Sequence, residues 1–535
     1  MSTKLNKISV FAIVFFLSTL SLFAQNTPPS CVITMPHCNA YFEQGTDVNI
    51  RVYSTDKGGS YPAGSVAKVE FFADSIKLGE SNISESDTYT FNWTDVPAGT
   101  YRLIAKATDN EDTVFTSAGV IITVGMEEVV PLGMSANKGK YLANLDGYRR
   151  SDFKNYWNGV TSENDCKWES IEYIRDAMNW TNADKSYNFA KNNYMSFRYH
   201  TIVWGKQYPK WLESLNPEEF QAELEEYMAA IAARYPLIDQ IDVLNENMHL
   251  NSYNKQEHSA GMPYFRAGLG GPGETGYDWA IWLFEKARQY FPNAKLIVND
   301  FELETNNAGL NEILDLIKVL RDRGLIDGIG TQAHYFNIDN ISKTNLQNAL
   351  NNMAKSGVPV YATELDMKGS SSNEVSQLTS YQNAFPVYWN HPAVAGITIW
   401  GYVDGQTWST GTGLLTNTGA KKSAMTWLES YMNDLPNVGY PFYDGSGTTS
   451  SKMIERENNL SVYPNPVTAG NITLEYHTGE IINLIQIFDN QGKSVKSILA
   501  NQAKVDVDLS NLDRGIYYLR AQTEKTVLNH KILIP

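Results

Sequence analysis

The stretch from residue 196 to residue 246 decides the fold, because strand and helix signals alternate in it. It begins with SFRYHTIVW (196–204), continues with PEEFQAELEEYMAAIAARY (217–235) and ends with QIDVLNE (240–246). The middle segment has the start signals of a helix, with Asn216 as N-cap, Pro217 at the first helical position and Glu219 to close a capping box. Its apolar side chains follow at helical spacing. The flanking apolar runs suit buried strands, so the stretch predicts a strand–helix–strand unit.

The same alternation extends over residues 129–435. Apolar or β-branched runs of strand length occur at Leu132–Ala136, Gly159–Glu163, Ser196–Trp204, Gln240–Glu246, Lys295–Asp300, Gly328–Tyr335, Val358–Asp366 and Val394–Gly401. Helical patterns lie between most of them, including Tyr277–Tyr290 and Leu310–Arg323. Eight strands with helical crossovers in a segment of about 300 residues predict a (β/α)8 TIM barrel. A doubly wound open sheet is the alternative, but no G-x-G-x-x-G follows the first run.

Two small all-β domains are expected to flank this barrel. Residues 26–125 hold short alternating runs between turn residues, a pattern typical of a β-sandwich. Residues 460–535 repeat the pattern. Between the barrel and this tail, residues 436–459 are rich in Pro, Gly, Ser and Thr, which predicts a linker.

The N-terminus and the composition indicate export and exclude some partners. Lys4 and Lys7 precede a short apolar run, so residues 1–24 are predicted to be a secretory signal peptide, and no membrane span is expected in the mature chain. The net charge is 43 − 59 = −16 without a basic run, which argues against nucleic acid as a partner.

An exported chain permits disulfides. The spacing of Cys31 and Cys38 allows a bridge and equally allows free thiols.

Two carboxylates follow apolar strands at positions where chemistry is expected. In a (β/α)8 barrel the active residues lie at the C-terminal ends of the strands. The fourth run ends in Asn245-Glu246, and the seventh ends in Glu364-Leu365-Asp366. Cleavage of a glycosidic bond needs one proton donor and one carboxylate that stabilises or attacks the sugar carbon. A lone Glu at a strand end is an ordinary surface residue, but the pair favours a glycoside hydrolase.

Other strand ends supply what this chemistry needs. The sixth run ends at Gln332-Ala333-His334, where an imidazole beside Glu364 would keep that carboxylate ionised and oriented. Further hydrogen-bonding and flat aromatic side chains are Glu163, Asn164, Lys167, His200, Trp204, Gln207, Trp400 and Trp408. A metal site needs converging histidines and carboxylates. His200 and His334 are possible ligands, but neither a metal nor an organic cofactor is expected.

Residues 129–435 resemble family 10 glycoside hydrolases, the retaining endo-β-1,4-xylanases. The matching strings, in order, are SENDCKW, FRYHTIVWGKQYP, IDVLNEN, AKLIVNDFE, GIGTQAHY, VYATELDM and GITIWGYVDGQTW. The resemblance implies hydrolysis of internal bonds of xylan, with Glu246 as acid/base and Glu364 as nucleophile. It also implies that Asn245 binds the sugar 2-hydroxyl and that His334 supports Glu364. The residues implied to line the glycone subsites are Glu163, Asn164, Lys167, His200, Trp204, Gln207, Gln332, Trp400 and Trp408.

Three departures from the family pattern leave the fine specificity open. Gly205 stands where the family often has His, Phe301-Glu302 replaces a usual Tyr-Asn, and Ile241 replaces a common Trp. None of them removes a catalytic group. Another β-linked glycan, such as mixed-linkage xylan or β-glucan, is the alternative substrate. A non-catalytic carbohydrate-binding surface protein is the alternative from a different class, although a degenerate enzyme usually lacks one of the two carboxylates.

The flanking domains carry resemblances of their own. VAKVEFFADSIKLGES and PAGTYRLIAKATDNEDT, within residues 26–125, resemble bacterial immunoglobulin-like modules, which implies a spacer. VYPNP, IQIFDNQGKSV and DLSNLDRGIYYLRA, within residues 460–535, resemble the C-terminal sorting domain of the type IX secretion pathway. That second resemblance implies the type IX machinery as a partner and an extracellular or surface-attached protein. A sugar-binding β-module is the alternative for the tail.

Overall fold

The computed structural model of the chain describes most of its residues. These are residues 26–43, 45–56, 64–125, 133–136, 138–247, 261–436, 460–465, 467, 470–476, 481–488, 494–523 and 527–534. The chain divides into two compact units, Met1–Gly439 and Tyr440–Pro535. The predicted signal peptide (1–24) and, apart from Pro436, the predicted linker (436–459) lie outside the described residues.

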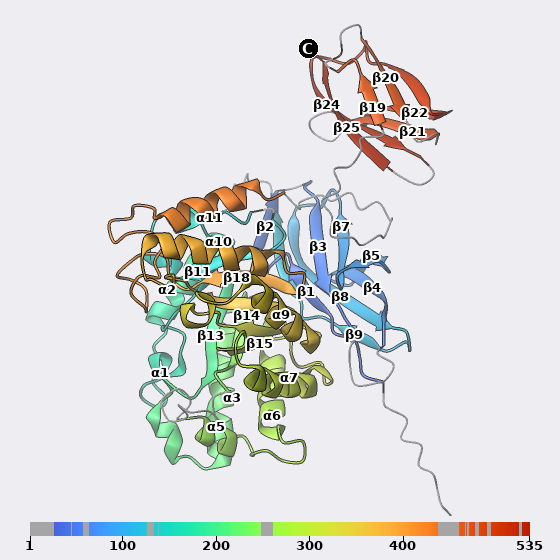
Figure 1. Cartoon of the computed structure of the whole chain (residues 1–535). Helices are drawn as coiled ribbons and strands as arrows, with labels where there is room; N and C mark the ends of the chain where they lie inside the picture. Colours follow the sequence, from blue (N-terminus) through green and yellow to red (C-terminus); the bar gives the residue numbers. More distant parts are fainter. Residues whose placement is uncertain are drawn as a thin grey trace, which may run out of the picture. The chain divides into compact units, whose positions relative to one another are not determined.

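The N-terminal part of the first unit is a pair of β-sheets (Figure 1). Its strands are β1 (Val32–Met35), β2 (Ala40–Glu43), β3 (Val48–Tyr53), β4 (Val66–Ala73), β5 (Ile76–Ser81), β6 (Ser84–Glu85), β7 (Thr88–Trp93), β8 (Gly99–Asp109), β9 (Val114–Thr116) and β10 (Val120–Gly125). One sheet has the order β1-β3-β7-β6, and the other has the order β2-β10-β8-β4-β5 with β9 paired to β8. Alternate residues of β4 and β10 are buried, and Ile50, Phe71 and Ile122 pack in one core. We call residues 26–125 the N-terminal module.

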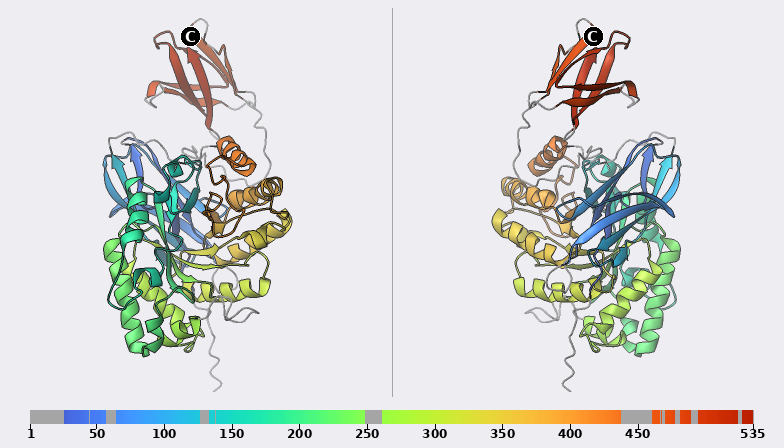
Figure 2. Two further views of the ribbon diagram at one scale, coloured as in Figure 1. Left: turned by 90° about the vertical axis from the view of Figure 1, so that its left-hand side faces the viewer. Right: turned by 90° about the vertical axis from the view of Figure 1, so that its right-hand side faces the viewer.

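The larger part of the first unit is a closed barrel, as predicted. Among the described strands, the barrel contains β11 (Tyr141–Leu145), β12 (Gly159–Thr161), β13 (Ser196–Trp204), β14 (Gln240–Asn245), β15 (Lys295–Asp300), β16 (Gly328–Thr331), β17 (Val360–Leu365) and β18 (Val394–Ile399). Neighbouring strands pair in parallel around the ring. Helices cover the outside of the barrel (Figure 2), so the strands are buried on both faces, which is why most of them read as continuous apolar runs.

The described α-helices lie between or after these strands. They are α1 (Trp168–Ile171), α2 (Thr181–Asn192), α3 (Pro217–Arg234), α5 (Met262–Gly268), α6 (Asp278–Tyr290), α7 (Asn307–Arg321), α8 (Tyr335–Ile338), α9 (Lys343–Met353), α10 (Glu374–Asn390) and α11 (Ser423–Asp434). The predicted capping box of α3 is present: Asn216 Oδ1 accepts from the Glu219 amide at 2.9 Å, and the Asn216 amide donates to Glu219 Oε2 at 3.2 Å. Within the part of the chain that was described, no helix is both long and apolar enough to cross a membrane.

Two sequence-based strand assignments differ from the structure. The predicted first strand, Leu132–Ala136, is wrong: residues 133–136 form a turn closed by the Ala136 amide on the Gly133 carbonyl, and the first barrel strand is β11. β11 is buried along its whole length and pairs with both β12 and β18, which decides the assignment. The sixth run is also shorter than expected, because the chain leaves β16 after Thr331 and turns into α8 at Tyr335.

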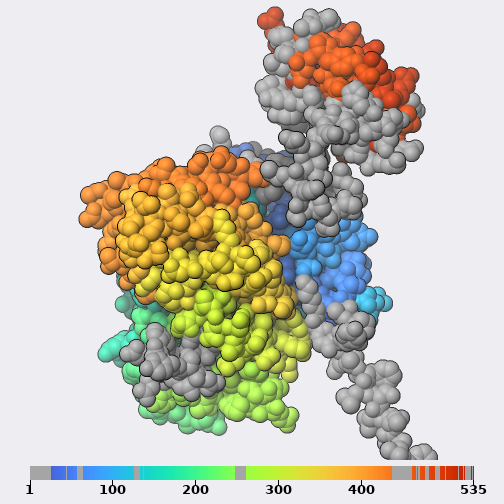
Figure 3. All heavy atoms as spheres, viewed as in Figure 1, coloured from blue at the N-terminus to red at the C-terminus, as the bar shows by residue number. Residues whose placement is uncertain are grey.

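The N-terminal module packs against the N-terminal ends of the barrel strands, the end opposite to the one expected to be catalytic. The Cys38 amide donates to Asp239 Oδ1 at 2.6 Å, and the same oxygen accepts from Lys295 Nζ at 2.9 Å. Thr55 Oγ1 donates to the Gly357 carbonyl at 3.0 Å. Tyr53 joins the hydrophobic core of the barrel. The space-filling view shows the blue surface of the module alongside the barrel (Figure 3).

The cysteines of the chain form no bridge. Cys31, Cys38 and Cys166 are all buried and free. Burial raises the pKa of the Cys31 and Cys38 thiols to about 12, so both remain protonated at neutral pH.

The second unit is a β-structure with two sheets. Its strands are β19 (Leu460–Tyr463), β20 (Asn471–Tyr476), β21 (Ile482–Phe488), β22 (Ser494–Gln502), β23 (Lys504–Asp508), β24 (Gly515–Gln522) and β25 (Val527–Ile534). The sheets have the orders β19-β20-β23 and β22-β21-β24-β25. Ile472, Leu474, Ile485 and Leu519 are buried in its core.

Candidate active site

A cleft of about 810 Å³ opens at the C-terminal ends of the barrel strands. Its lining residues are Glu163, Asn164, Lys167, His200, Trp204, Lys206, Gln207, Glu246, Phe301, Glu302, Gln332, His334, Tyr335, Phe336, Glu364, Trp400 and Trp408. All of the site residues predicted from the sequence therefore line one cleft, except Asn245, which is buried and contacts the lining residue Gln332. Phe301 and Glu302, two of the departures from the family pattern, form part of the wall.

Glu364 stands at the end of β17 among hydrogen-bond donors and positive charges. Its Oε1 accepts from Asn299 Nδ2 at 2.8 Å and lies 3.8 Å from Arg198 Nη2. Its Oε2 lies 3.5 Å from His334 Nε2. Burial by itself would raise the pKa of Glu364, but the hydrogen bond from His334 and the charges of the neighbouring His and Arg side chains outweigh it and lower the pKa to about 2. Glu364 is therefore an ionised carboxylate at neutral pH.

His334 is held between two carboxylates. Its Nδ1 lies 3.1 Å from Asp366 Oδ2, and its Nε2 faces Glu364. Asp366 Oδ2 also accepts from Trp408 Nε1 at 2.5 Å, so the indole that lines the cleft is tied to the same group. Burial would lower the pKa of His334, but Asp366 and Glu364 raise it to about 10. An imidazolium between two carboxylates fixes the orientation of Glu364.

Glu246 has the opposite electrostatic environment. It follows β14 with a positive φ of 55°, and its amide donates to the Asn299 carbonyl at 2.9 Å. Its Oε1 accepts from Gln332 Nε2 at 3.1 Å. Burial raises the pKa of Glu246, hydrogen bonds from Gln332 and Trp204 partly oppose this, and the negative charge of Glu364 raises the pKa further. Glu246 is thus the carboxyl of the pair that retains a proton more readily.

Three amide side chains, Asn299, Asn245 and Gln332, connect the two carboxyl groups. Asn299 Nδ2 donates both to Glu364 and to Asn245 Oδ1, the latter at 2.9 Å. Gln332 Nε2 donates to Glu246 and lies 3.5 Å from the same Asn245 oxygen. Because Asn245 Oδ1 accepts both contacts, its Nδ2 group is left as the donor. The sequence prediction missed Asn299, although a buried Asn at the end of the fifth apolar run is a signal that could have found it.

One wall of the cleft is built from the loops after β12 and β13. Lys167 Nζ donates to Asn164 Oδ1 at 2.9 Å and to Gln207 Oε1 at 2.7 Å, and it lies 4.6 Å from the ring centroid of Trp204. Burial lowers the pKa of Lys167, although Glu364 and Glu163 oppose the shift. Burial also raises the pKa of Glu163. This wall presents polar groups with fixed orientations beside a flat ring.

Buried charges support the cleft from inside the barrel. Asp242 Oδ2 accepts from Arg198 Nη2 at 2.8 Å and lies 2.7 Å from His200 Nδ1. The His200 ring meets Trp400 edge-on, with 5.5 Å between the ring centroids. The sequence prediction did not select Arg198, Asp242 or Asp366. Charged residues within apolar strands are the signal that could have found the first two.

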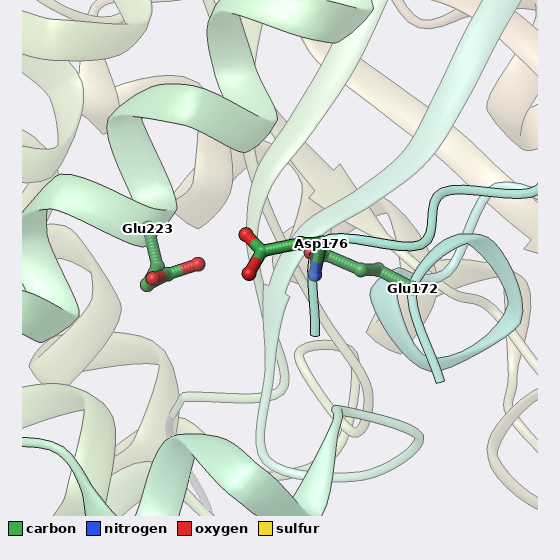
Figure 4. Close-up of side chains that lie close together, drawn as sticks. All are labelled: Glu172, Asp176 and Glu223. Atoms are coloured by element: carbon green, nitrogen blue, oxygen red, sulfur yellow. Dashed lines mark hydrogen bonds between the residues drawn. The ribbon is translucent and has the colours of Figure 1, made fainter. Parts of the chain in front are cut away.

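Outside the cleft, one group of carboxylates stands among the described residues. Glu172, Asp176 and Glu223 offer oxygen atoms that lie within 4.8 Å of one another (Figure 4). Glu223 is paired with the guanidinium of Arg175, and Glu172 accepts from Trp168 Nε1 at 2.9 Å and from the Asp176 amide at 2.9 Å.

The barrel matches a known family model. The model described as "Glycosyl hydrolase family 10" matches residues 125–431, more than half of the chain. The chain belongs to glycosyl hydrolase family 10.

Several known proteins are similar to this family 10 chain. Endo-1,4-beta-xylanase B of Cellvibrio japonicus is 38% identical over 300 residues, which cover 55% of this chain and 46% of that protein, so the chain spans about half the length of this relative. Endo-1,4-beta-xylanase B of Thermotoga neapolitana is 30% identical over 270 residues, covering 48% of this chain and 73% of that protein. Among solved structures, xylanase 10B from Thermotoga maritima is 25% identical with a TM-score of 0.48, covering 56% of this chain and 97% of that chain.

The flanking parts match families as well. Residues 29–114 match the model "Bacterial Ig domain", and residues 461–535 match "Secretion system C-terminal sorting domain". The sorting domain marks a chain of the type IX secretion pathway, so the protein is extracellular or lies at the cell surface. Both resemblances inferred from the sequence are thereby confirmed.

Proposed function

We propose that this family 10 chain is a retaining endo-β-1,4-xylanase that hydrolyses internal β-1,4-xylosidic bonds of xylan by double displacement. The observation that carries the proposal is that two carboxyl groups of one cleft have pKa shifts in opposite directions. The pKa of Glu364 is lowered to about 2, and that of Glu246 is raised. A retaining glycosidase needs one ionised nucleophile and one protonated acid. The xylanase names of the relatives favour xylan as the substrate.

In the first step, a carboxylate oxygen of Glu364 attacks the anomeric carbon of the sugar in the glycone site. The bond from that carbon to the bridging oxygen breaks as Glu246 gives its proton to the departing oxygen. The aglycone leaves as an alcohol, and the glycone remains as an ester of Glu364. Glu246 is now ionised, and its pKa is expected to fall because the negative charge of Glu364 has gone.

In the second step, Glu246 acts as base. It removes a proton from a water molecule, whose oxygen attacks the anomeric carbon and displaces the carboxylate of Glu364. The two inversions restore the β-configuration of the product. Both carboxyl groups then have their original protonation states, and the cycle is closed.

The neighbouring residues take positioning and binding roles in this proposal. Asn245, whose Nδ2 is oriented as a donor, binds the sugar 2-hydroxyl and strengthens that bond as the ring flattens. His334 orients Glu364 and keeps it ionised. The aromatic rings of Trp204, Trp400 and Trp408 stack on sugar faces, and the remaining polar residues predicted for the glycone subsites are Glu163, Asn164, Lys167, His200, Gln207 and Gln332.

The whole chain is proposed to work as four parts after removal of the signal peptide (1–24). An immunoglobulin-like domain (26–125) precedes the hydrolase barrel (129–435), and a linker (436–459) leads to the sorting domain (460–535). The partners are xylan at the cleft and the type IX secretion machinery at the tail. No cofactor is proposed.

The test compares reducing-sugar release from xylan by the wild type and by Glu246→Ala and Glu364→Ala. Each variant is expected to lose several orders of magnitude in kcat, because covalent and acid/base catalysis both depend on the missing group. Glu304→Gln is the matched control: Glu304 is also buried with a raised pKa, yet it does not line the cleft. Near-normal turnover in either Ala variant would refute the assigned roles.

Stereochemistry and substrate class need separate measurements. Proton NMR of the nascent product is expected to show the β-anomer first, and an early α-anomer would contradict the double displacement. Release of reducing sugar from linear xylan is expected to exceed release from mixed-linkage xylan and from β-glucan. A preference for either of the other glycans would reassign the substrate while leaving the mechanism in place.

A further inference from the structure

The N-terminal module contacts the barrel along a row of neighbouring strands. The contacted segments precede the successive strands β13 to β17, at the N-terminal end of the barrel. On the module, the contacts come from the turn before β2, from the end of β3 and from the region β8 to β10. Two domains of one chain are expected to move relative to each other unless their interface is extensive. A flexible spacer does not need contacts with successive strands of its neighbour.

Hydrogen bonds join the two parts at separate places around the barrel. Asn39 Nδ2 donates to the Ala190 carbonyl at 3.3 Å and lies 3.4 Å from the Met195 carbonyl, directly before β13. Arg102 Nε donates to Asn293 Oδ1 at 2.7 Å, two residues before β15. Because these bonds lie on different connections of the barrel, they hold the module in a fixed orientation.

Buried polar groups of the barrel receive hydrogen bonds from the module. Asp239 and Lys295 are 1% and 3% exposed, and Asp239 Oδ1 accepts both from Lys295 Nζ and from the Cys38 amide. Before β17, the Gly357 carbonyl accepts from Thr55 Oγ1, and Thr55 is buried as well. A buried ion pair or polar group is costly unless its remaining hydrogen bonds are made. This end of the barrel therefore depends on donors that the module supplies.

Apolar side chains cross the same interface. Tyr53 lies on β3 of the module but belongs to the hydrophobic core of the barrel. Phe115 of β9 lies against Gly324 before β16, where an added Cβ would come within 2.2 Å of the ring. A contiguous buried cluster usually marks a single domain. The two parts thus share apolar packing as well as hydrogen bonds.

We propose that the N-terminal module is a structural part of the hydrolase, which closes the N-terminal end of the barrel and unfolds together with the barrel as one cooperative unit. This role differs from the spacer that the immunoglobulin-like resemblance implies. In (β/α)8 barrels the N-terminal face serves stability, whereas the opposite face carries the active site. The module therefore stabilises the scaffold of the cleft without contributing a residue to its lining.

The test is native-state hydrogen exchange of the full chain in low concentrations of urea, followed by mass spectrometry. The slowest amides of an element report the opening that exposes them. Ile50→Val removes one methylene group from the core of the module. We expect the slowest amides of β14, β15 and β16 to exchange about two- to twelvefold faster, in step with those of β3 and β7, as for the usual cost of this substitution. A spacer would confine the change to β3 and β7.

A second variant tests the contact surface itself. Within the described residues, the Asn39 side chain donates only to main-chain carbonyls of the barrel, in the range 190–195. Asn39→Asp replaces this donor with a carboxylate that the carbonyl oxygens repel, and Asp tolerates the φ of 69° at this position. The matched control is Asn110→Asp, which retains the side-chain oxygen that accepts from the Ser65 amide within the module.

Asn39→Asp is expected to make the slowest barrel amides exchange about two- to tenfold faster, and Asn110→Asp is expected to leave them at the wild-type rate. Barrel amides that keep the wild-type rate in Ile50→Val would overturn the proposal and make the module a spacer. Equal responses to Asn39→Asp and Asn110→Asp would overturn it as well. Since no substrate is used, the result is independent of whether the chain hydrolyses xylan.

Discussion

His334 and Glu364 face each other in the cleft, with Nε2 of the imidazole 3.5 Å from Oε2 of the carboxylate. The pKa of His334 is raised to about 10 and that of Glu364 is lowered to about 2, so at neutral pH the proton is on the imidazole and the negative charge is on the carboxylate. The pair is therefore ionised over a wide pH range. The acid limb of the pH profile of activity is therefore expected to depend on His334, although His334 does not itself react with the substrate.

His334→Gln is expected to move the acid limb of the pH profile of kcat/KM upward by about 1–3 pH units, because an opposite charge near a carboxylate lowers its pKa by that amount. The sign follows from the chemistry: without the imidazolium, Glu364 becomes protonated, and loses its nucleophilicity, at a higher pH. The profile is measured with an aryl β-xylobioside. The control is His391→Gln, which removes a buried imidazole that caps the C-terminal end of α10 and does not line the cleft. An unchanged acid limb in His334→Gln would show that His334 does not set the charge of Glu364.

Glu364→Gln is expected to lower the pKa of Glu246, because the negative charge of Glu364 contributes to raising it. Burial is the larger cause of the raised pKa of Glu246. We therefore expect this pKa to fall in the variant but to remain above the ordinary value of a glutamate. The titration can be followed by carbon NMR with labelled glutamate side chains. Glu304 serves as an internal reference, since its raised pKa arises from burial and Glu364 is not among its causes. A Glu246 pKa that rises or stays constant would contradict the coupling on which the two-step proposal depends.

Trp408→Ala is expected to raise KM for xylan more than it lowers kcat, because the indole is 48% exposed at the rim of the cleft and is available to stack on sugar. A loss of about 1.4 kcal/mol in binding corresponds to a tenfold increase in KM. Steady-state kinetics on xylan provide the measurement. Tyr173→Ala, which removes an aromatic side chain that is 72% exposed outside the cleft, should leave KM unchanged. Equal KM values for Trp408→Ala and the wild type would show that Trp408 does not contribute to substrate binding.

Asp239→Asn is expected to destabilise the protein by about 3–5 kcal/mol, because it leaves the buried charge of Lys295 without its partner. The change also weakens the contact of the Cys38 amide, which joins the N-terminal module to the barrel. Urea unfolding of the full chain measures the loss. Glu429→Gln, which breaks the more exposed pair with Lys421, is the control and should cost less than about 1 kcal/mol. Since Asp239 lies at the opposite end of the barrel from the cleft, kcat/KM of the folded variant should match the wild type.

The sequence by itself determined the periodic features of this protein. Apolar runs such as Ser196–Trp204 and Lys295–Asp300 coincide with β13 and β15, and the helix predicted from Asn216 begins where its capping box requires. These features are local, since a strand or a helix start depends on residues that are neighbours in the chain. The positions of Glu246 and Glu364 at strand ends also follow from the sequence, because parallel strands of one barrel end on the same face.

Only the tertiary structure decided which groups meet. Asn299 connects Asn245 with Glu364, and nothing in its local sequence states that its amide bonds to residues 54 and 65 positions away. The misplaced first strand has a similar origin, since β11 is defined by its pairing with β18 at the other end of the barrel sequence. Likewise, the docking of Cys38 against Asp239 spans 201 positions. Contacts between distant residues depend on how the whole barrel closes, and a local pattern does not carry that information.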